Sequence, residues 1–517
     1  MYFLTKSKLT SLSVTSFVLF IVSLVLAFVI VPIVVHSQID KNVQLVRGTE
    51  QWHRFKQLPF NLTLNVTFFE VSNAQQVIEN GEIPVLKEKG PYIFDEIIKK
   101  TNLIYKDEDD SISYKRNIQF HFNQLKSGSD LSYDDTITII NPIYLSIMQM
   151  AKDFPIPPLL VATSIEKCLN SMFSDRLLLT ATVGSLMFDG IRVCDYNNKN
   201  CDLFLLGSIC TFFEGKTKLI EKVETADEKY LKFSFLNFKV RDPDGTYEIK
   251  TGIENIDDVG RIVRWNNQNH TDFWVKDRME NSCNLIEGTD GTIFQPHVAE
   301  DTILTAFSTD ICRTVDIFYV GQDTYRDIEG FIYKPETSLL YSRTKAPHDD
   351  CFCVQKTLDV DGKKSCFLDG VMDLYPCIGV PVLLSFPHLL YADKKYLKNL
   401  RGDIKPDENK HSLYVLVDKY SGIPLEAHKR IQMNIIMRPY EGFEKMTSKL
   451  PRTILPLFWM DEGVELPDIG IDLLNSLLYD TIKMVDILKW AFIGVTLALT
   501  IFFSSLLAYG YCNGFEN

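Results

Sequence analysis

Six cysteines between Cys283 and Cys377 are the residues whose type and spacing point most directly to chemistry. An even set at irregular spacing is typical of a disulfide framework in an oxidising compartment, and spacing alone leaves all fifteen pairings open. Zinc needs paired Cys-x-x-Cys or Cys/His ligands. The string Cys351-Phe352-Cys353, followed by single cysteines, fits that pattern poorly. We therefore predict disulfides here, with no metal and no cofactor. The six are Cys283, Cys312, Cys351, Cys353, Cys366 and Cys377.

Four further cysteines precede this window and one follows it. Cys168, Cys194, Cys201 and Cys210 permit two more bridges, but nothing in their spacing selects a pairing. Cys512 is followed by five residues and stands next to an apolar segment. A cysteine beside a membrane span is placed for palmitoylation.

Catalytic and pore-forming patterns are weak in this chain. There is no Gly-x-Ser-x-Gly, no His-Glu-x-x-His and no P-loop. Gly288-Thr289-Asp290-Gly291 is the only string similar to a glycine-rich phosphate site, and it stands near a cysteine in a predicted turn. A channel would need spans with a small or polar face, and Phe502-Phe503 crowd the segment that contains Ser504-Ser505. We predict that the protein is neither an enzyme nor a channel.

Both ends of the chain carry uncharged apolar segments long enough to cross a bilayer. They run from Leu9 to Val35 and from Ala491 to Tyr511, and about 20 apolar residues of helix suffice. Lys6 and Lys8 precede the first segment, so the short tails are expected in the cytosol. A cleaved signal peptide is the alternative, but the run is longer than an ordinary signal core. The predicted divisions are cytosolic tails at 1–8 and 512–517, membrane helices at 9–35 and 490–511, and an extracellular or luminal domain at 36–489.

Composition and local patterns describe a large folded domain between these spans. The 517 residues are 46% hydrophobic and 12% aromatic, and the net charge of −13 argues against nucleic acid. Short alternating stretches such as Leu62–Val71 and Ile118–Phe122, separated by turn signals, are typical of an antiparallel sheet or barrel. Residues 136–188 are predicted to form several short helices, either packed in the core or exposed as an apolar cap. Asn61, Asn65 and Asn269 begin glycosylation sequons.

Several strings, taken with the two terminal spans, resemble the class B scavenger receptor family across nearly the whole chain. The family includes fatty-acid translocase, the high-density-lipoprotein receptor, lysosomal integral membrane protein type 2 and insect sensory-neuron membrane proteins. The strings are Glu88-Lys89-Gly90-Pro91-Tyr92, Cys283-Asn284 through Gly288-Thr289-Asp290-Gly291, Ser308 to Arg313, Cys351-Phe352-Cys353, Gly379-Val380-Pro381, Ser385 to Ala392 and Ile454 to Trp459.

The resemblance implies an α+β fold. An antiparallel, β-barrel-like core would enclose an apolar tunnel, with an apical helical bundle in 136–188 and a disulfide-rich region in 283–377. It implies the bridges Cys283–Cys351, Cys312–Cys377 and Cys353–Cys366, and it places Lys167 beside the ligand entrance. A lysine there would attract a fatty-acid carboxylate, although a solvated surface lysine is the simpler interpretation.

The function that the resemblance implies is a scavenger-type membrane receptor. It would bind lipids or lipoprotein particles and transfer fatty acids, sterols or carotenoids through the tunnel to the membrane. The alternative is a trafficking receptor of lysosomes or endosomes that binds a protein partner at the apex. The tail at 512–517 has no dileucine signal, so the plasma membrane is the expected location, with endocytosis and the lysosome as alternatives. The ligand and the oligomeric state stay open at this point.

Overall fold

A computed structural model describes residues 6–153, 157, 159–162, 177–196, 210–211, 213–274, 282–341 and 351–512. The chain divides into two units, one made of Met1–Gln44 with Leu466–Asn517 and the other of Leu45–Glu465. The two chain ends therefore form one unit together, and the long segment between them forms the other.

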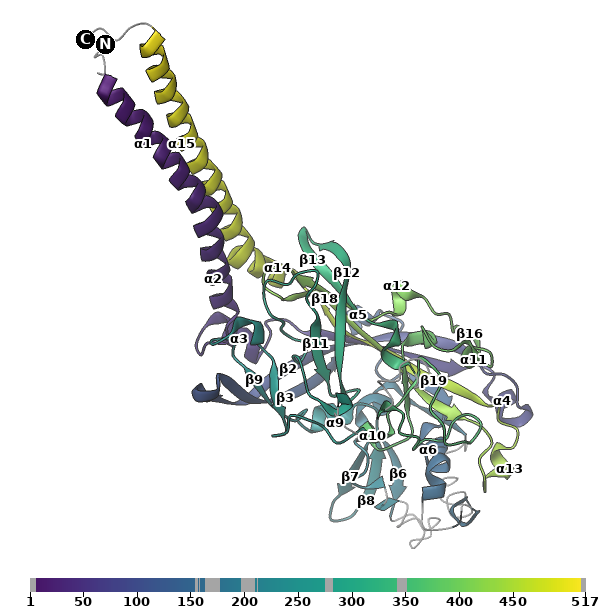
Figure 1. Cartoon of the computed structure of the whole chain (residues 1–517). Helices are drawn as coiled ribbons and strands as arrows, with labels where there is room; N and C mark the ends of the chain where they lie inside the picture. The colour runs from purple at the N-terminus through teal and green to yellow at the C-terminus, as the bar shows by residue number, and fades with distance from the viewer. Residues whose placement is uncertain are drawn as a thin grey trace. The chain divides into compact units, whose positions relative to one another are not determined.

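The first unit is built from two helical runs that lie side by side (Figure 1). The N-terminal run consists of α1 (Lys6–Val25), the π-helix η1 (Leu26–Ile30) and α2 (Val31–Val43). The C-terminal run consists of α14 (Asp468–Leu474), the π-helix η10 (Asn475–Tyr479) and α15 (Asp480–Cys512). Both are long and apolar enough to cross a membrane, and they contain the predicted spans 9–35 and 490–511.

Hydroxyl groups join α1 to α15 at three levels. The Ser23 and Thr496 hydroxyls lie 2.9 Å apart, and those of Ser13 and Ser504 lie 3.0 Å apart. Thr500 donates to the carbonyl of Ser16 at 2.9 Å. Small polar residues at such an interface let two membrane helices approach closely and hydrogen-bond. The serines in the first span therefore have a structural reason to interrupt an otherwise apolar run.

A large antiparallel sheet of 14 strands organises the second unit. The short strands β14 (Met372–Asp373) and β15 (Leu383–Ser385) attach through β18, and β16 (Arg401–Gly402) pairs in parallel with β2. The other strands follow the order β10 (Ile262–Trp265), β9 (Thr246–Lys250), β3 (Ser111–Phe122), β2 (Val85–Lys106), β1 (Leu62–Val71), β19 (Thr453–Glu465), β18 (Pro424–Met437), β17 (Tyr414–Asp418), β13 (Ile328–Pro335), β12 (Arg313–Tyr325) and β11 (Leu304–Ser308).

One face of this sheet is called the inner face here and is defined by Phe458, Met460 and Glu462 of β19. Residues directly opposite one another in antiparallel strands share a face. Met460 lies opposite Val66 of β1 and Ile431 of β18, and Glu462 lies opposite Leu64 and Lys429. Through β1 the same face continues to residues of β2, namely Tyr92, Phe94 and Glu96. The inner face is thus apolar along most of its length and charged near Glu462.

Two smaller sheets and a buried helix lie in the sequence between β3 and β9 of the large sheet. They are β4 (Thr136–Ile140) with β5 (Leu178–Thr182), and β6 (Ile191–Asp195), β8 (Lys229–Phe233) and β7 (Ile220–Glu224) in that order. The prediction of helices alone in 136–188 is wrong at β4 and β5, because the β-branched run at 136–140 favours a strand. Residues 163–176, where a further helix was expected, lie outside the described residues.

Helix α6 (Pro142–Met150) distinguishes core packing from an exposed apolar cap for its own residues. Asn141 caps the helix by accepting hydrogen bonds from the backbone of Ile143 and Tyr144, and Pro142 occupies the first turn, where its missing N–H costs nothing. All nine helical residues are buried. The helix therefore packs in the core and does not form an exposed cap.

The remaining helices are short connections. Gly81 ends one of them in the left-handed conformation (φ 72°), as the Asn80-Gly81 turn signal predicts. They are α3 (Glu50–Lys56), α4 (Ala74–Asn80), α5 (Gln124–Ser127), α9 (Asn237–Arg241), α10 (Tyr375–Ile378), α11 (Lys394–Leu397), α12 (Glu408–His411) and α13 (Glu444–Thr447), with the 3-10 turns η2 (Asp107–Asp109), η3 (Ala151–Asp153), η5 (Ile256–Asp258), η6 (Ser282–Asn284), η7 (Thr337–Leu340) and η9 (Pro387–Leu389), and the π-helix η4 (Ser185–Asp189).

Candidate ligand cavity and its surroundings

An apolar cavity lies between α6 and the three-stranded sheet β6–β8–β7. Its empty space is about 680 Å³, a figure that includes open solvent at its mouth. Ser146 supplies the one hydroxyl group of the lining, and every other lining residue is apolar or a disulfide cysteine. The lining residues are Pro142, Ile143, Ser146, Ile147, Val193, Cys194, Phe213, Leu219, Ile220, Leu231, Phe233, Phe235, Val380 and Val382. Such a lining suits a hydrocarbon.

A disulfide braces the wall of this cavity. Cys194, at the end of β6, is bonded to Cys210, a pairing that sequence reasoning had left open. The cross-link joins β6 to the segment that carries Phe213, another lining residue. Cys168 and Cys201 lie outside the described residues.

Three further disulfides hold the region 283–377. They join Cys283 to Cys351, Cys312 to Cys377 and Cys353 to Cys366, which are the pairings that the family resemblance implies. Within the described part of the chain, no group of three or more His, Cys, Asp or Glu residues could hold a metal ion.

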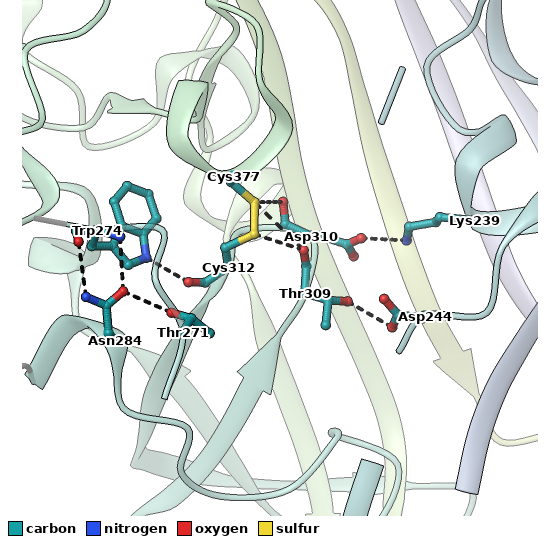
Figure 2. Close-up of a disulfide and its surroundings, with 9 residues drawn as sticks. All are labelled: Lys239, Asp244, Thr271, Trp274, Asn284, Thr309, Asp310, Cys312 and Cys377. Atoms are coloured by element: carbon teal, nitrogen blue, oxygen red, sulfur yellow. Dashed lines mark hydrogen bonds and ion pairs between the residues drawn. A yellow bond between two sulfur atoms is a disulfide. The ribbon is translucent and has the colours of Figure 1, made fainter. Parts of the chain in front are cut away.

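Figure 2 shows how the Cys312–Cys377 bond is fixed in place. The indole Nε1–H of Trp274 donates to the carbonyl of Cys312 at 2.7 Å. Asn284 holds Trp274 by accepting from its backbone N–H at 3.0 Å and donating to its carbonyl at 3.1 Å. Asn284 of the Cys283-Asn284 string is thus a positioning residue for the disulfide region, which explains its place beside the cysteine.

The glycine-rich string Gly288-Thr289-Asp290-Gly291 has a structural role. Asp290 forms a buried ion pair with Lys100 at 3.2 Å and accepts a hydrogen bond from the Tyr114 hydroxyl at 2.9 Å. Gly288 has φ 77°, and a side chain there would collide with the carbonyl of Thr305. The string forms a tight turn whose carboxylate is already paired with a lysine of the sheet.

A ring of four charges lies beside the inner face near Glu462. Lys239 Nζ lies 2.8 Å from Asp310 and 3.4 Å from Glu462. Lys429 Nζ lies 2.5 Å from Asp310 and 2.6 Å from Glu462. Although burial raises the pKa of both carboxyl groups, the two ammonium groups lower it below its usual range. The ring is electrically neutral, and Figure 2 shows its Lys239–Asp310 side next to the disulfide.

Glu96 faces this ring from β2. Its residue is 0% exposed, and neither carboxyl oxygen has a hydrogen-bond partner. Burial, followed by the negative charge of Glu462, raises the pKa of Glu96 to about 8, against the lowering effect of Lys239 and Lys429. Sequence reasoning missed this residue because one glutamate in an alternating strand carries no signal.

Three of the strings that carry the family resemblance meet at Glu88, away from the inner face. Its Oε1 accepts from His388 Nε2 at 3.0 Å and from Trp459 Nε1 at 2.7 Å. His388 Nδ1 accepts from the backbone N–H of Lys405, which leaves its proton on Nε2. His411 stacks on His388 with ring centroids 3.9 Å apart. This partly buried network cross-links segments distant in sequence and gives His388 of the Ser385–Ala392 string a structural role.

The other predicted site residues are scattered. Lys167 lies outside the described residues. Asn61 and Asn269 are exposed, whereas Asn65 lies in β1 with its amide oxygen buried. Cys512 is an exposed free thiol at the end of α15. The structure therefore does not gather these residues into one site.

Comparison with known proteins places these observations in context. A model of the CD36 family matches residues 14–507. Sensory neuron membrane protein 2 of Anopheles gambiae is 28% identical over 95% of this chain and 91% of its own length. Its counterpart in Heliothis virescens is 30% identical over 96% and 92%. Sensory neuron membrane protein 1 of Mamestra brassicae is 31% identical over 90% and 84%.

Proposed function

Since this chain belongs to the CD36 family, we propose that it is a membrane receptor that binds lipids or lipoprotein particles and transfers apolar ligands through its ectodomain to the membrane. Fatty acids, sterols and carotenoids are the ligand classes that fit. The relatives named above are sensory neuron membrane proteins, and the proposed role is that of a receptor rather than an enzyme.

The apolar cavity between α6 and the three-stranded sheet β6–β8–β7 is the observation that carries this proposal. Moving a lipid chain through water costs about 0.8 kcal/mol for each exposed methylene. A cavity lined by side chains such as Ile143, Leu231 and Phe233 removes that cost for the part of the chain that it encloses. The four disulfides within the described part of the chain help to keep the ectodomain folded outside the cell.

The two apolar helical runs supply the membrane attachment. They make the chain an integral membrane protein. A ligand that the ectodomain releases is therefore already held close to a bilayer. A receptor of this kind raises the local ligand concentration at the membrane without a soluble carrier.

Plugging the cavity tests the proposal. Ser146 lies in the middle of α6 and contributes to the lining, so Ser146→Phe places a ring in the cavity, whereas Ser146→Ala keeps its volume. Cells that express the full chain are supplied with a fluorescent fatty acid and, separately, a sterol ester. We expect Ser146→Phe to lower the uptake of both ligands at least fivefold when equal amounts of protein are present at the cell surface. Ser146→Ala should match wild type.

The two main failures of this experiment have different meanings. Wild-type uptake in the Ser146→Phe cells would show that the cavity is not on the ligand route. Uptake by wild-type cells no higher than by untransfected cells would reject lipid transfer and favour the trafficking receptor. Labelled lipoprotein binding should survive Ser146→Phe, because the substitution is buried.

A further inference from the structure

The segment 404–411, called the strap here, follows β16 and ends with α12. Most of its side chains are exposed, whereas Ile404 is half-buried against the core and His411 is buried. The middle of the strap is attached to the domain through the backbone N–H groups of Lys405 and Asp407. Both of these attachments use a histidine.

Two imidazole rings accept hydrogen bonds from the backbone of the strap. The N–H of Lys405 donates to Nδ1 of His388 at 3.1 Å, and the N–H of Asp407 donates to Nδ1 of His411 at 3.0 Å. An imidazole nitrogen that accepts a hydrogen bond has no proton, so each ring is neutral and has its proton on Nε2. The strap is therefore held by a form of the two histidines that exists only while neither is charged.

Protonation converts each of these contacts from attraction to repulsion. Nε2 already carries a proton, so an added proton goes to Nδ1, where the backbone N–H of the strap points. Two donors then face each other and the hydrogen bond is lost. The rings of His388 and His411 also stack, with centroids 3.9 Å apart and planes at 12°, so two charged rings would repel each other at close range.

The charged groups that face His411 belong to β2, to β18 and to the strap itself. Burial, followed by the neighbouring His388, lowers the pKa of His411 to about 4. Arg430 of β18 acts in the same direction, and the carboxylates of Glu88 and Asp407 oppose it only in part. These surroundings thus favour the neutral ring that the hydrogen-bond geometry requires.

Glu88 is the carboxylate that contacts His388. Its Oε1 accepts from His388 Nε2 at 3.0 Å and from Trp459 Nε1 at 2.7 Å. Although burial raises the pKa of Glu88, these hydrogen bonds lower it below its usual range. Strands β1 and β19 contribute Phe69 and Trp459 to this contact, and neither ring carries a charge. The strap adds the exposed ammonium group of Lys405. One carboxylate compensates the charge of one imidazolium, so a doubly protonated pair is unfavourable here.

We propose that the strap is a latch that His388 and His411 hold closed while they are neutral and release when acid protonates them. A released histidine regains its ordinary pKa of about 6.5. Since the pKa of bound His411 is about 4, the closed form loses stability as the pH falls from about 6.5 towards that value. His411 alone then raises the ratio of released to bound strap by up to about tenfold per pH unit. Release uncovers the indole of Trp459, on which His411 packs with ring centroids 5.8 Å apart. The latch goes beyond the proposed function, because it depends on acidity and not on the ligand.

Hydrogen–deuterium exchange resolved to single amides tests the latch in the full chain, reconstituted in nanodiscs at pH 7 and at pH 5. The amides of Lys405 and Asp407 report release of the strap. The amide of Asp403 donates to the carbonyl of Leu86 at 2.8 Å, outside the strap, and reports opening of the whole domain. After correction for the intrinsic effect of pH, we expect exchange at Lys405 and Asp407 to be at least about tenfold faster at pH 5. Exchange at Asp403 should be unchanged.

A double variant, His388→Asn with His411→Asn, separates the histidines from other acid-sensitive groups. The oxygen of an asparagine side chain lies near the position of Nδ1, accepts a hydrogen bond and takes up no proton in this pH range. The acid-dependent increase should therefore disappear. His121→Asn is the matched control, because His121 is an exposed histidine of β3, and it should keep the increase of wild type.

Three results would overturn the latch. Equal protection of Lys405 and Asp407 at both pH values in wild type would do so, and this comparison needs no variant to fold. An increase that survives in the double variant would assign the release to other groups. An increase of the same size at Asp403 would show that acid opens the whole domain and not the strap.

Discussion

Phe235 and Phe458 meet edge to face, with their ring centroids 4.6 Å apart and their planes at 61°. Phe235 belongs to the cavity lining and Phe458 to the inner face of β19. Both side chains are buried. The pair therefore forms the wall between the cavity and the part of the sheet that leads to the charged ring.

Trimming this wall should alter ligand movement more than it alters folding. We expect Phe458→Leu to cost about 1–3 kcal/mol of stability and to raise the rate of ligand uptake about twofold or more, because it widens the way out of the cavity. Phe443→Leu is the control, since Phe443 is equally buried but is not the ring that packs against Phe235 in this contact. Thermal denaturation and uptake assays measure the two effects. The same uptake change in both variants would show that the wall does not control passage.

The contact between Ser23 and Thr496 predicts a specific cross-link within the membrane unit. Their hydroxyls lie 2.9 Å apart, so Ser23→Cys with Thr496→Cys should form a disulfide on mild oxidation. The pair Phe17→Cys with Ile501→Cys is the control, because both side chains are exposed on the helices. A protease site inserted between the spans lets gel electrophoresis detect the bond. Equal yields from the two pairs would contradict the helix pairing described above.

The disulfides should differ in their contribution to stability. Cys312–Cys377 closes 65 residues and Cys353–Cys366 closes 13. Chain entropy then predicts losses of about 4 and about 3 kcal/mol, respectively, when each bond is replaced by two alanines. Trp274 and Asn284 pack around the first bond, which adds to the difference. Thermal denaturation of the full chain measures both losses, and a larger loss from the shorter loop would refute the ranking.

Glu96 predicts a stability that falls as pH rises. Its pKa in the folded chain is about 8, above the usual value for an unfolded glutamate, about 4.3. Between those values the folded state binds the additional proton, so the free energy of unfolding decreases with rising pH. Glu96→Gln removes this dependence. Thermal denaturation of both proteins is measured at pH 5 and pH 8. Between these pH values the free energy of unfolding of wild type should fall relative to that of Glu96→Gln, on the order of a few kcal/mol. Parallel pH profiles would show that Glu96 is ionised throughout.

His428 predicts a second pH dependence of stability, at higher pH. Although burial lowers its pKa, hydrogen bonds to Asp461 and Glu426 raise the pKa to about 9. The raised value means that its stabilising charge is fully present below about pH 6.5 and is lost as pH rises through 9. His428→Gln should therefore destabilise the chain at pH 6 and much less at pH 10. A loss that is the same at both pH values would mean that packing, not charge, explains its effect.

Glycosylation is predicted to differ among the three sequons. Asn61 and Asn269 are exposed, and Asn65 lies within β1 with its amide oxygen buried. We expect Asn61→Gln and Asn269→Gln each to lower the apparent mass of the protein from a secretory host, and Asn65→Gln to leave it unchanged. Gel mobility before and after glycosidase treatment measures this. A mass decrease only for Asn65→Gln would be inconsistent with the β1 register.

Much of this protein could be anticipated from the chain alone. Uncharged apolar runs identify the spans because bilayer thickness sets their length. Leu62–Val71 was predicted as a strand and is β1, since alternation is a local property. The family strings implied the disulfide pairs that the structure contains. At 136–140 the same local reasoning failed, because apolar clustering outweighed the β-branched composition of that run.

Tertiary structure alone decided which charged side chains pair with one another and where an apolar cavity forms. Lys239, Asp310, Lys429 and Glu462 are up to 223 residues apart, and each reads in the sequence as a solvated charge. The register of β18 on β19, and of β1 on both β19 and β2, brings Lys429, Glu462 and Glu96 to one face. A shift of one residue would turn them to the other. Charge pairing, the raised pKa of Glu96 and the apolar cavity depend on that long-range register, which local patterns of hydropathy do not encode.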